Sequence, residues 1–169
     1  MPEYIFDTTV LSNFAAVHRL DLLKGHYQGV IFTTLEVSNE LRKGAHAGYA
    51  YLQSALRQIE TIGPEGWIRL LSPDSVTEHR LRAEFDQYLD AGEASCLALA
   101  ISRGFTLVTD DLAARRLAQA RDVPLSGTLG ILIALTRENA LPLDEANALL
   151  TTMIQQRYRS PVDRIDELV

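Results

Sequence analysis

The chain has 169 residues, a formal net charge of −6 at pH 7 and 47% hydrophobic residues. This length suits one domain, 1–169, and the sequence holds neither a secretory signal nor an apolar run of the roughly 18 residues that span a membrane, so we expect a cytoplasmic protein with no membrane partner. The single cysteine excludes an intrachain disulfide, and no histidine has the close His or Cys partner of a zinc site.

Short apolar runs alternate with longer amphipathic segments along the chain. The short runs predict strands over residues 4–6, 30–32, 67–71, 105–109 and 123–126. The amphipathic segments predict helices over residues 10–17, 35–43, 45–62, 77–89, 93–103, 112–120, 128–138 and 144–157. Thr33 precedes Glu36 by three residues, which predicts a capping box for the second helix, and we expect Gly44 to end that helix.

This alternation of strands and helices predicts an α/β fold. Strands joined through helices form right-handed crossovers, which place the strands in parallel and the helices on both faces of the sheet. We therefore expect a three-layer α/β/α sandwich with a central parallel sheet. Ligands of such sheets bind beyond the carboxyl ends of the strands.

Two of the predicted strands end in acidic residues. Asp7 follows the first strand, and Asp110 and Asp111 follow the fourth. Parallel strands bring these carboxylates to the same edge of the sheet, although Asp after a strand also serves as an ordinary helix cap.

Two further acids lie on predicted helices near that edge. The capping box already explains Glu36, so Glu40, one turn deeper in the same helix, is the better functional candidate. Glu93 is the first residue of a long apolar helix, whereas we expect Asp90, three residues earlier, to be the helix cap or a solvated residue. Grouped carboxylates repel one another and stay ionised only if a cation shares the site, and Mg²⁺ prefers such oxygen ligands. A bound cation can activate water and orient a phosphate, and it would offset the acidic charge that otherwise argues against a nucleic-acid ligand.

Taken in order, these acidic segments resemble the motifs of PIN domains. Segment 7–11, DTTVL, has the Asp followed two residues later by Ser or Thr. Segments 37–41 (VSNEL), 92–100 (GEASCLALA) and 107–111 (LVTDD) are similar to the second, third and fourth acid motifs. Segment 127–132, GTLGIL, resembles the same branch, which carries Glu in the third motif. The resemblance covers nearly the whole chain.

The resemblance implies a metal-dependent nuclease that cleaves single-stranded RNA with Mg²⁺ or Mn²⁺. It also implies frequent homodimers, and often a toxin role beside a small antitoxin protein, as in VapC-type proteins. The implied metal ligands are Asp7, Glu40, Glu93 and either Asp110 or Asp111. The hydroxyl of Thr9 can orient a metal-bound water or the Asp7 carboxylate, and Thr109 either does similar work or packs in the strand.

Other functions remain open at this point. A haloacid-dehalogenase-type phosphatase would need a second Asp where Thr9 stands. A catalytically inert module that binds RNA or a protein agrees better with the acidic charge, because few basic residues flank the expected site. Arg42, Arg115 and Arg116 are the candidates for substrate phosphate contacts, and a solvated helix surface is the alternative explanation for them.

Two features of the C-terminal third bear on partners. The predicted helix 128–138 is apolar on most sides, which indicates either burial or pairing with a second subunit. The segment 157–161, RYRSP, is basic at its start and is either an RNA contact or a solvated end.

Overall fold

A five-stranded parallel sheet lies at the centre of the computed structural model, which describes residues 2–28, 30–60 and 66–169. Its strands are β1 (Tyr4–Phe6), β2 (Ile31–Thr34), β3 (Ile68–Leu71), β4 (Thr106–Val108) and β5 (Leu125–Ser126). They lie in the order β3-β2-β1-β4-β5, so the direction of winding reverses between β1 and β4. That reversal is the switch point at which α/β sheets bind ligands.

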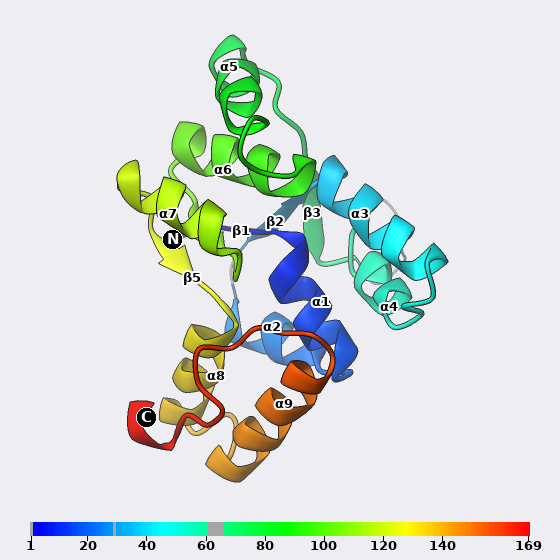
Figure 1. Cartoon of the computed structure of the whole chain (residues 1–169), viewed down its shortest axis with the longest axis vertical. Helices are drawn as coiled ribbons and strands as arrows, with labels where there is room; N and C mark the ends of the chain where they lie inside the picture. The colour runs from blue at the N-terminus through cyan, green and yellow to red at the C-terminus, as the bar shows by residue number, and fades with distance from the viewer. Residues whose placement is uncertain (1, 29, 61–65) are drawn as a thin grey trace.

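Helices flank both sides of the sheet, which confirms the predicted three-layer α/β/α sandwich (Figure 1). In Figure 1, α5, α6 and α7 lie above the strands, and α1, α2, α8 and α9 lie below them. The helices are α1 (Thr8–Ala16), α2 (Leu20–His26), α3 (Leu35–His46), α4 (Leu52–Arg57), α5 (Val76–Phe85), α6 (Ala91–Arg103), α7 (Leu112–Ala120), α8 (Thr128–Arg137), α9 (Leu143–Gln155) and a terminal 3₁₀ turn, η1 (Asp166–Leu168). None of the helices in the described ranges is long and apolar enough to cross a bilayer.

The structure corrects several local predictions. Thr34, rather than Thr33, caps α3, because its hydroxyl accepts the Val37 N–H at 3.2 Å, whereas the Thr33 hydroxyl donates to the Phe6 carbonyl of the neighbouring strand. Glu36 therefore belongs to no capping box, and its carboxylate pairs with Arg82 of α5 instead.

Two helix boundaries were also predicted wrongly. Gly44 does not end α3, which continues to His46, and the segment predicted as one helix over 45–62 turns before α4 begins at Leu52. The last two residues of that prediction lie outside the described residues. Helix α2 was not predicted, because its seven residues are too few for a clear periodic pattern.

Helix α6 is the best buried helix of the core. It packs against β1, β2 and β4, and its residues from Ala94 to Ala100 are all buried. The apolar character of α8 is explained in part within the chain, since Ile131, Leu132 and Leu135 are buried and α8 packs on α9. The buried side of α8 therefore needs no second subunit to cover it, and the homodimer stays a prediction.

A buried ion pair fixes α5 against α6. The Glu78 carboxylate is 3% exposed, accepts from the Arg103 guanidinium at 2.8 Å and also receives the Ser102 hydroxyl at 3.1 Å. Hydrogen bonds from Arg103 and from the N–H groups of Asp74 and Ser75 hold the pKa of the Glu78 carboxyl well below its usual range. Because Arg103 is the last residue of α6, the pair helps to set the position of this helix over the sheet.

We expect Arg103→Met to lower the free energy of unfolding by about 3 kcal/mol, because it leaves a buried carboxylate without its partner. Urea unfolding measures the loss. The double variant Arg103→Met/Glu78→Gln should recover part of it, and Arg80→Met, which changes an exposed arginine of α5, should cost little. A loss for Arg103→Met no larger than that of the Arg80 control would contradict the role given to this pair.

Candidate functional site

The Asp7 carboxylate is the centre of the candidate site. Asp7 follows β1 and caps α1, and it is completely buried. Its Oδ1 accepts the Thr9 hydroxyl at 2.6 Å and the Thr9 N–H at 3.0 Å, and its Oδ2 accepts the Thr109 hydroxyl. The hydrogen bond expected from Thr9 to Asp7 is therefore present, and Thr109 does similar work from the end of β4.

The same two hydroxyls connect Asp7 to the acids that follow β4. The Thr9 oxygen accepts the Asp110 N–H at 2.9 Å, and the Thr109 oxygen accepts the Asp111 N–H at 3.1 Å. Each threonine hydroxyl thus accepts a hydrogen bond from a backbone N–H and donates one to an oxygen of Asp7, Thr9 to Oδ1 and Thr109 to Oδ2. This network fixes the carboxyl ends of β1 and β4 at the switch point of the sheet.

Asp110 is fixed by polar groups from two other helices. Its Oδ2 accepts from the Asn13 amide at 2.9 Å and from the Thr128 hydroxyl at 2.5 Å, and its Oδ1 accepts the Thr128 N–H at 2.8 Å. Gly127 leaves room for this carboxylate, since a Cβ there would lie 2.7 Å from Asp110 Oδ1. Asn13 and Thr128 were not predicted, because they lie far from Asp110 along the chain.

Glu93 and Asp111 occupy neighbouring helix starts. Asp90 and Glu93 form a capping box on α6, as the Asp90 carboxylate accepts the Glu93 N–H at 2.9 Å and the Glu93 carboxylate accepts the Asp90 N–H at 3.2 Å. Asp90 is thus the cap, which is one of the two roles expected for it. The Asp111 carboxylate caps α7 by accepting the Ala114 N–H at 2.8 Å.

The Glu40 carboxylate of α3 connects the starts of α6 and α1. Its Oε1 accepts the Gly92 N–H at 2.7 Å, and its Oε2 accepts the Thr8 hydroxyl. A Cβ on Gly92 would approach the Glu40 carboxylate to 2.5 Å, so only glycine lets this carboxylate reach the backbone of α6. Thr8 and Gly92 were not predicted as site residues, although both stand beside predicted ones in the sequence.

The electrostatics of the site favour protonated carboxyls. Burial raises the pKa of Asp7 to about 7, with the charge of Asp110 adding to the effect and the two threonine hydroxyls opposing it. Burial, and then the charges of Asp90 and Asp111, raise the pKa of Glu93 to about 8. Burial also raises the pKa of Glu40 and that of Asp110. Asp7 senses the charge of Asp110, and Glu93 senses the charge of Asp7, so a cation among these carboxylates would stabilise their anions.

The donor set fits a divalent cation, but the side chains are not arranged around one position. Among the residues that the structure describes, no three His, Cys, Asp or Glu side chains are grouped closely enough to hold one metal ion. The reason is that Glu93, Glu40 and Asp111 are turned toward backbone N–H groups. All the donors are carboxylate oxygens, which Mg²⁺ and Mn²⁺ prefer, and rotation of the capping side chains would free them.

The three arginines expected near phosphate differ in position. Arg115 lies beside Asp110, where its Nη1 donates to the Thr109 carbonyl at 2.8 Å and to the Ser126 carbonyl at 3.0 Å. Arg116 is exposed on α7. Arg42 is exposed on α3 and donates to Asn39 at 3.1 Å, and no contact connects it with the acids in the described part of the chain.

This geometry defines a class of protein: a parallel α/β/α sandwich with carboxylates at the switch point of its sheet. The chain belongs to the PIN domain family DUF3368, whose model matches residues 3–169. PIN domains are generally nucleases. The resemblance of the four acidic segments to PIN-domain motifs is thereby confirmed at the level of the family.

Two solved structures share the fold. The protein PAE2754 from Pyrobaculum aerophilum is similar with a TM-score of 0.50 and 24% identity, over 82% of this chain and 98% of that one. VapBC2 from Rickettsia felis, bound to a DNA fragment from its promoter, is similar with a TM-score of 0.52 and 17% identity, over 74% of this chain and 98% of that one. No curated protein matches the chain.

The raised pKa values predict a pH-dependent stability in the absence of divalent cations. The folded protein holds protons on Asp7 and Glu93 that the unfolded chain releases near pH 4, so the free energy of unfolding should fall as the pH rises from about 4 to about 8 and level off above that. Urea unfolding in EDTA across this range measures the slope.

Asp7→Asn should make that slope shallower, because the amide does not titrate. Asp122→Asn is the matched control, since Asp122 is exposed and its positive φ of 55° suits Asn equally well. An equal slope in the wild type and in Asp7→Asn would show that Asp7 is ionised in the folded protein throughout.

Proposed function

We propose that the chain is an endoribonuclease that cleaves single-stranded RNA in the presence of Mg²⁺ or Mn²⁺. The observation that carries the proposal is the buried Asp7 carboxylate at the switch point, tied through Thr9 and Thr109 to the backbone of Asp110 and Asp111. Glu93 and Glu40 reach the same end of the sheet from α6 and α3. Membership of the PIN family supports a nuclease in particular.

Each residue has a defined part in this proposal. Asp7, Glu40, Glu93 and Asp110 or Asp111 would hold one or two cations, which supply Lewis acidity toward the phosphate and a water of lowered pKa. Thr9 and Thr109 orient Asp7. One carboxylate would accept a proton from the attacking water, and Arg115 or Arg116 would contact a phosphate oxygen of the substrate.

Asp110 and Asp111 differ in the number of hydrogen bonds that each would lose by turning toward a cation. Asp110 accepts three hydrogen bonds, and its carboxylate is held by Asn13 and Thr128 in one orientation. Asp111 accepts one cap hydrogen bond and lies close enough to Glu93 to raise the pKa of that residue. We therefore assign Asp111 as the movable ligand beside Glu93, and Asp110 as the ligand closest to Asp7.

The similarity to a VapBC complex supports a further part of the proposal, in which the chain is the toxin of a toxin–antitoxin pair and a small antitoxin protein binds it. Co-expression with the product of the adjoining reading frame tests this part. Growth arrest by the chain alone, relieved by the partner, is the expected result, and growth unaffected by the chain would count against it.

Cleavage of a mixed pool of single-stranded RNAs with Mn²⁺, with Mg²⁺ and with EDTA tests the activity. The wild type should cut only with a divalent cation, and Asp7→Asn should lower the rate by at least about 100-fold, because it removes the central carboxylate. Asp122→Asn should cut like the wild type. A wild type that neither cuts RNA nor binds Mn²⁺ would favour the alternative, an inert module that binds RNA or protein.

The contact between Gly92 and Glu40 gives a second test. In Gly92→Ala the added Cβ must displace the Glu40 carboxylate, which is the mobile end of a side chain, so the fold should survive while cleavage falls by about 10-fold or more. Gly25→Ala is the matched control, because nothing lies within 4 Å of a Cβ there. Full activity in Gly92→Ala would remove Glu40 from the site.

A further inference from the structure

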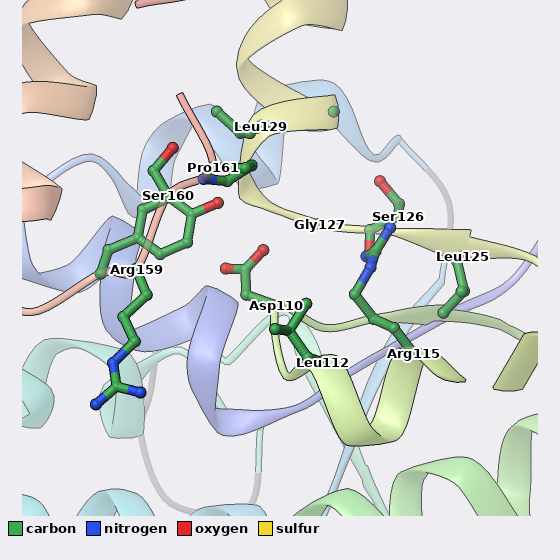
Figure 2. Close-up of a pocket in the computed structure, with 12 residues that line it drawn as sticks. Asp110, Leu112, Arg115, Leu125, Ser126, Gly127, Leu129, Arg159, Ser160 and Pro161 are labelled. Atoms are coloured by element: carbon green, nitrogen blue, oxygen red, sulfur yellow. The ribbon is translucent and has the colours of Figure 1, made fainter. Parts of the chain in front are cut away.

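A pocket of about 420 Å³ opens directly beside the candidate site, with Asp110 on its wall (Figure 2). Its other walls come from the start of α7, the connection between β5 and α8, the first turn of α8 and residues 158–161 of the C-terminal segment. The volume lies in the range of about 300–1,000 Å³ that is typical of small-ligand sites. A substrate bound at Asp110 would therefore lie next to this pocket.

The lining combines apolar surface with two guanidinium groups. The apolar part includes Leu112, which is 68% exposed at this position, and the ring of Tyr158. Arg115 lies on one side of Asp110 and Arg159 on the other (Figure 2). Arg159 is exposed and makes no hydrogen bond or ion pair with any residue in the described ranges. An aromatic ring beside arginines is the surface that a nucleotide of a single strand binds, through stacking of its base and pairing of its phosphate.

Hydrogen bonds fix the residues on both sides of the pocket. Arg115 is fixed by the carbonyls of Thr109 and Ser126. Where the C-terminal segment enters the pocket wall, it is held by the Tyr158 N–H, which donates to the Met153 carbonyl at 2.9 Å. After the pocket it is held by Ile165, which is fully buried and donates its N–H to Asn147 at 2.9 Å. Because both ends of the segment are fixed, residues 158–161 form a stable side of the pocket.

We infer that this pocket binds the nucleotide adjacent to the phosphate that is cut, with the base against the apolar lining and a phosphate at Arg159. This inference rests on the proposed ribonuclease function and adds to it a base-binding subsite built by the C-terminal segment. The subsite takes an unpaired base, because a base stacked within a duplex cannot enter a pocket.

Gly130 allows the pocket to be filled without changing its charge. It lies in the first turn of α8, and a Cβ there meets only Ser126 Oγ, at an ordinary 3.5 Å. Gly130→Phe should therefore fold and occupy the pocket, and Gly130→Ala is the matched control that leaves it open. The helix favours either residue over glycine.

The experiment measures fluorescence anisotropy of a labelled pool of single-stranded RNAs of eight nucleotides, in EDTA so that binding is separated from cleavage. Gly130→Phe should weaken binding by about tenfold relative to Gly130→Ala, with Mn²⁺ affinity unchanged. Blunt RNA duplexes should bind both variants equally. Equal affinity of the two variants for single strands, or an equal loss for duplexes, would overturn the subsite.

Arg159→Ala supplies an independent test, with Arg80→Ala on α5 as its control. Loss of one phosphate contact should reduce the slope of log affinity against log salt by about 0.7, and the control should leave the slope unchanged. A slope unaltered by Arg159→Ala would overturn the phosphate contact. A wild type that binds no RNA and cuts none would overturn the ribonuclease proposal together with the subsite, whereas a wild type that cuts RNA with unaffected variants would overturn the subsite alone.

Discussion

The Asp7 carboxylate is completely buried, and its hydrogen bonds determine how the functional end of the sheet is assembled. A buried carboxylate without partners would be strongly unfavourable, so its oxygens must find donors. Thr9 and Thr109 provide them, one from the first turn of α1 and one from the end of β4. Because these hydroxyls also accept the N–H groups of Asp110 and Asp111, the geometry of Asp7 and that of the two later acids are a single structural feature.

The acids around Asp7 serve the fold and the proposed chemistry with the same atoms. Asp111 and Glu93 accept backbone N–H groups at helix starts, and Glu40 binds the N–H of Gly92 on α6. These interactions stabilise helix N-termini, and they also hold Glu93 and Glu40 where burial raises the pKa of each, with the charges of Asp90 and Asp111 adding to the effect at Glu93. A divalent cation would compete with the backbone N–H groups for these oxygens, so binding it would slightly loosen the starts of α6 and α7 while neutralising the repulsion between the acids.

The net charge of −6 is compatible with an RNA substrate once its distribution is considered. Part of the negative charge lies at the end of the sheet, where a cation would bind it, while Arg115 and Arg159 lie beside that point rather than being spread over the surface. The C-terminal segment completes this arrangement. Its Arg159 is more than forty residues from Arg115 in the sequence, yet both line the pocket at Asp110.

The sequence by itself determined the layered parallel sheet, the location of acids after β1 and β4, and the family, since hydrophobic periodicity and short motifs are local properties of the chain. It left Asp90 as either the cap of α6 or a solvated residue, and the hydrogen bond from the Glu93 N–H decided for the cap. It placed the cap of α3 one residue too early, because the choice between Thr33 and Thr34 depends on which hydroxyl faces the Phe6 carbonyl of the next strand. Only the tertiary structure brought Asn13, 97 residues away, onto Asp110, and only it formed the pocket under the C-terminal segment. Such contacts depend on how separate elements pack, and packing leaves no periodic pattern in the residues that meet.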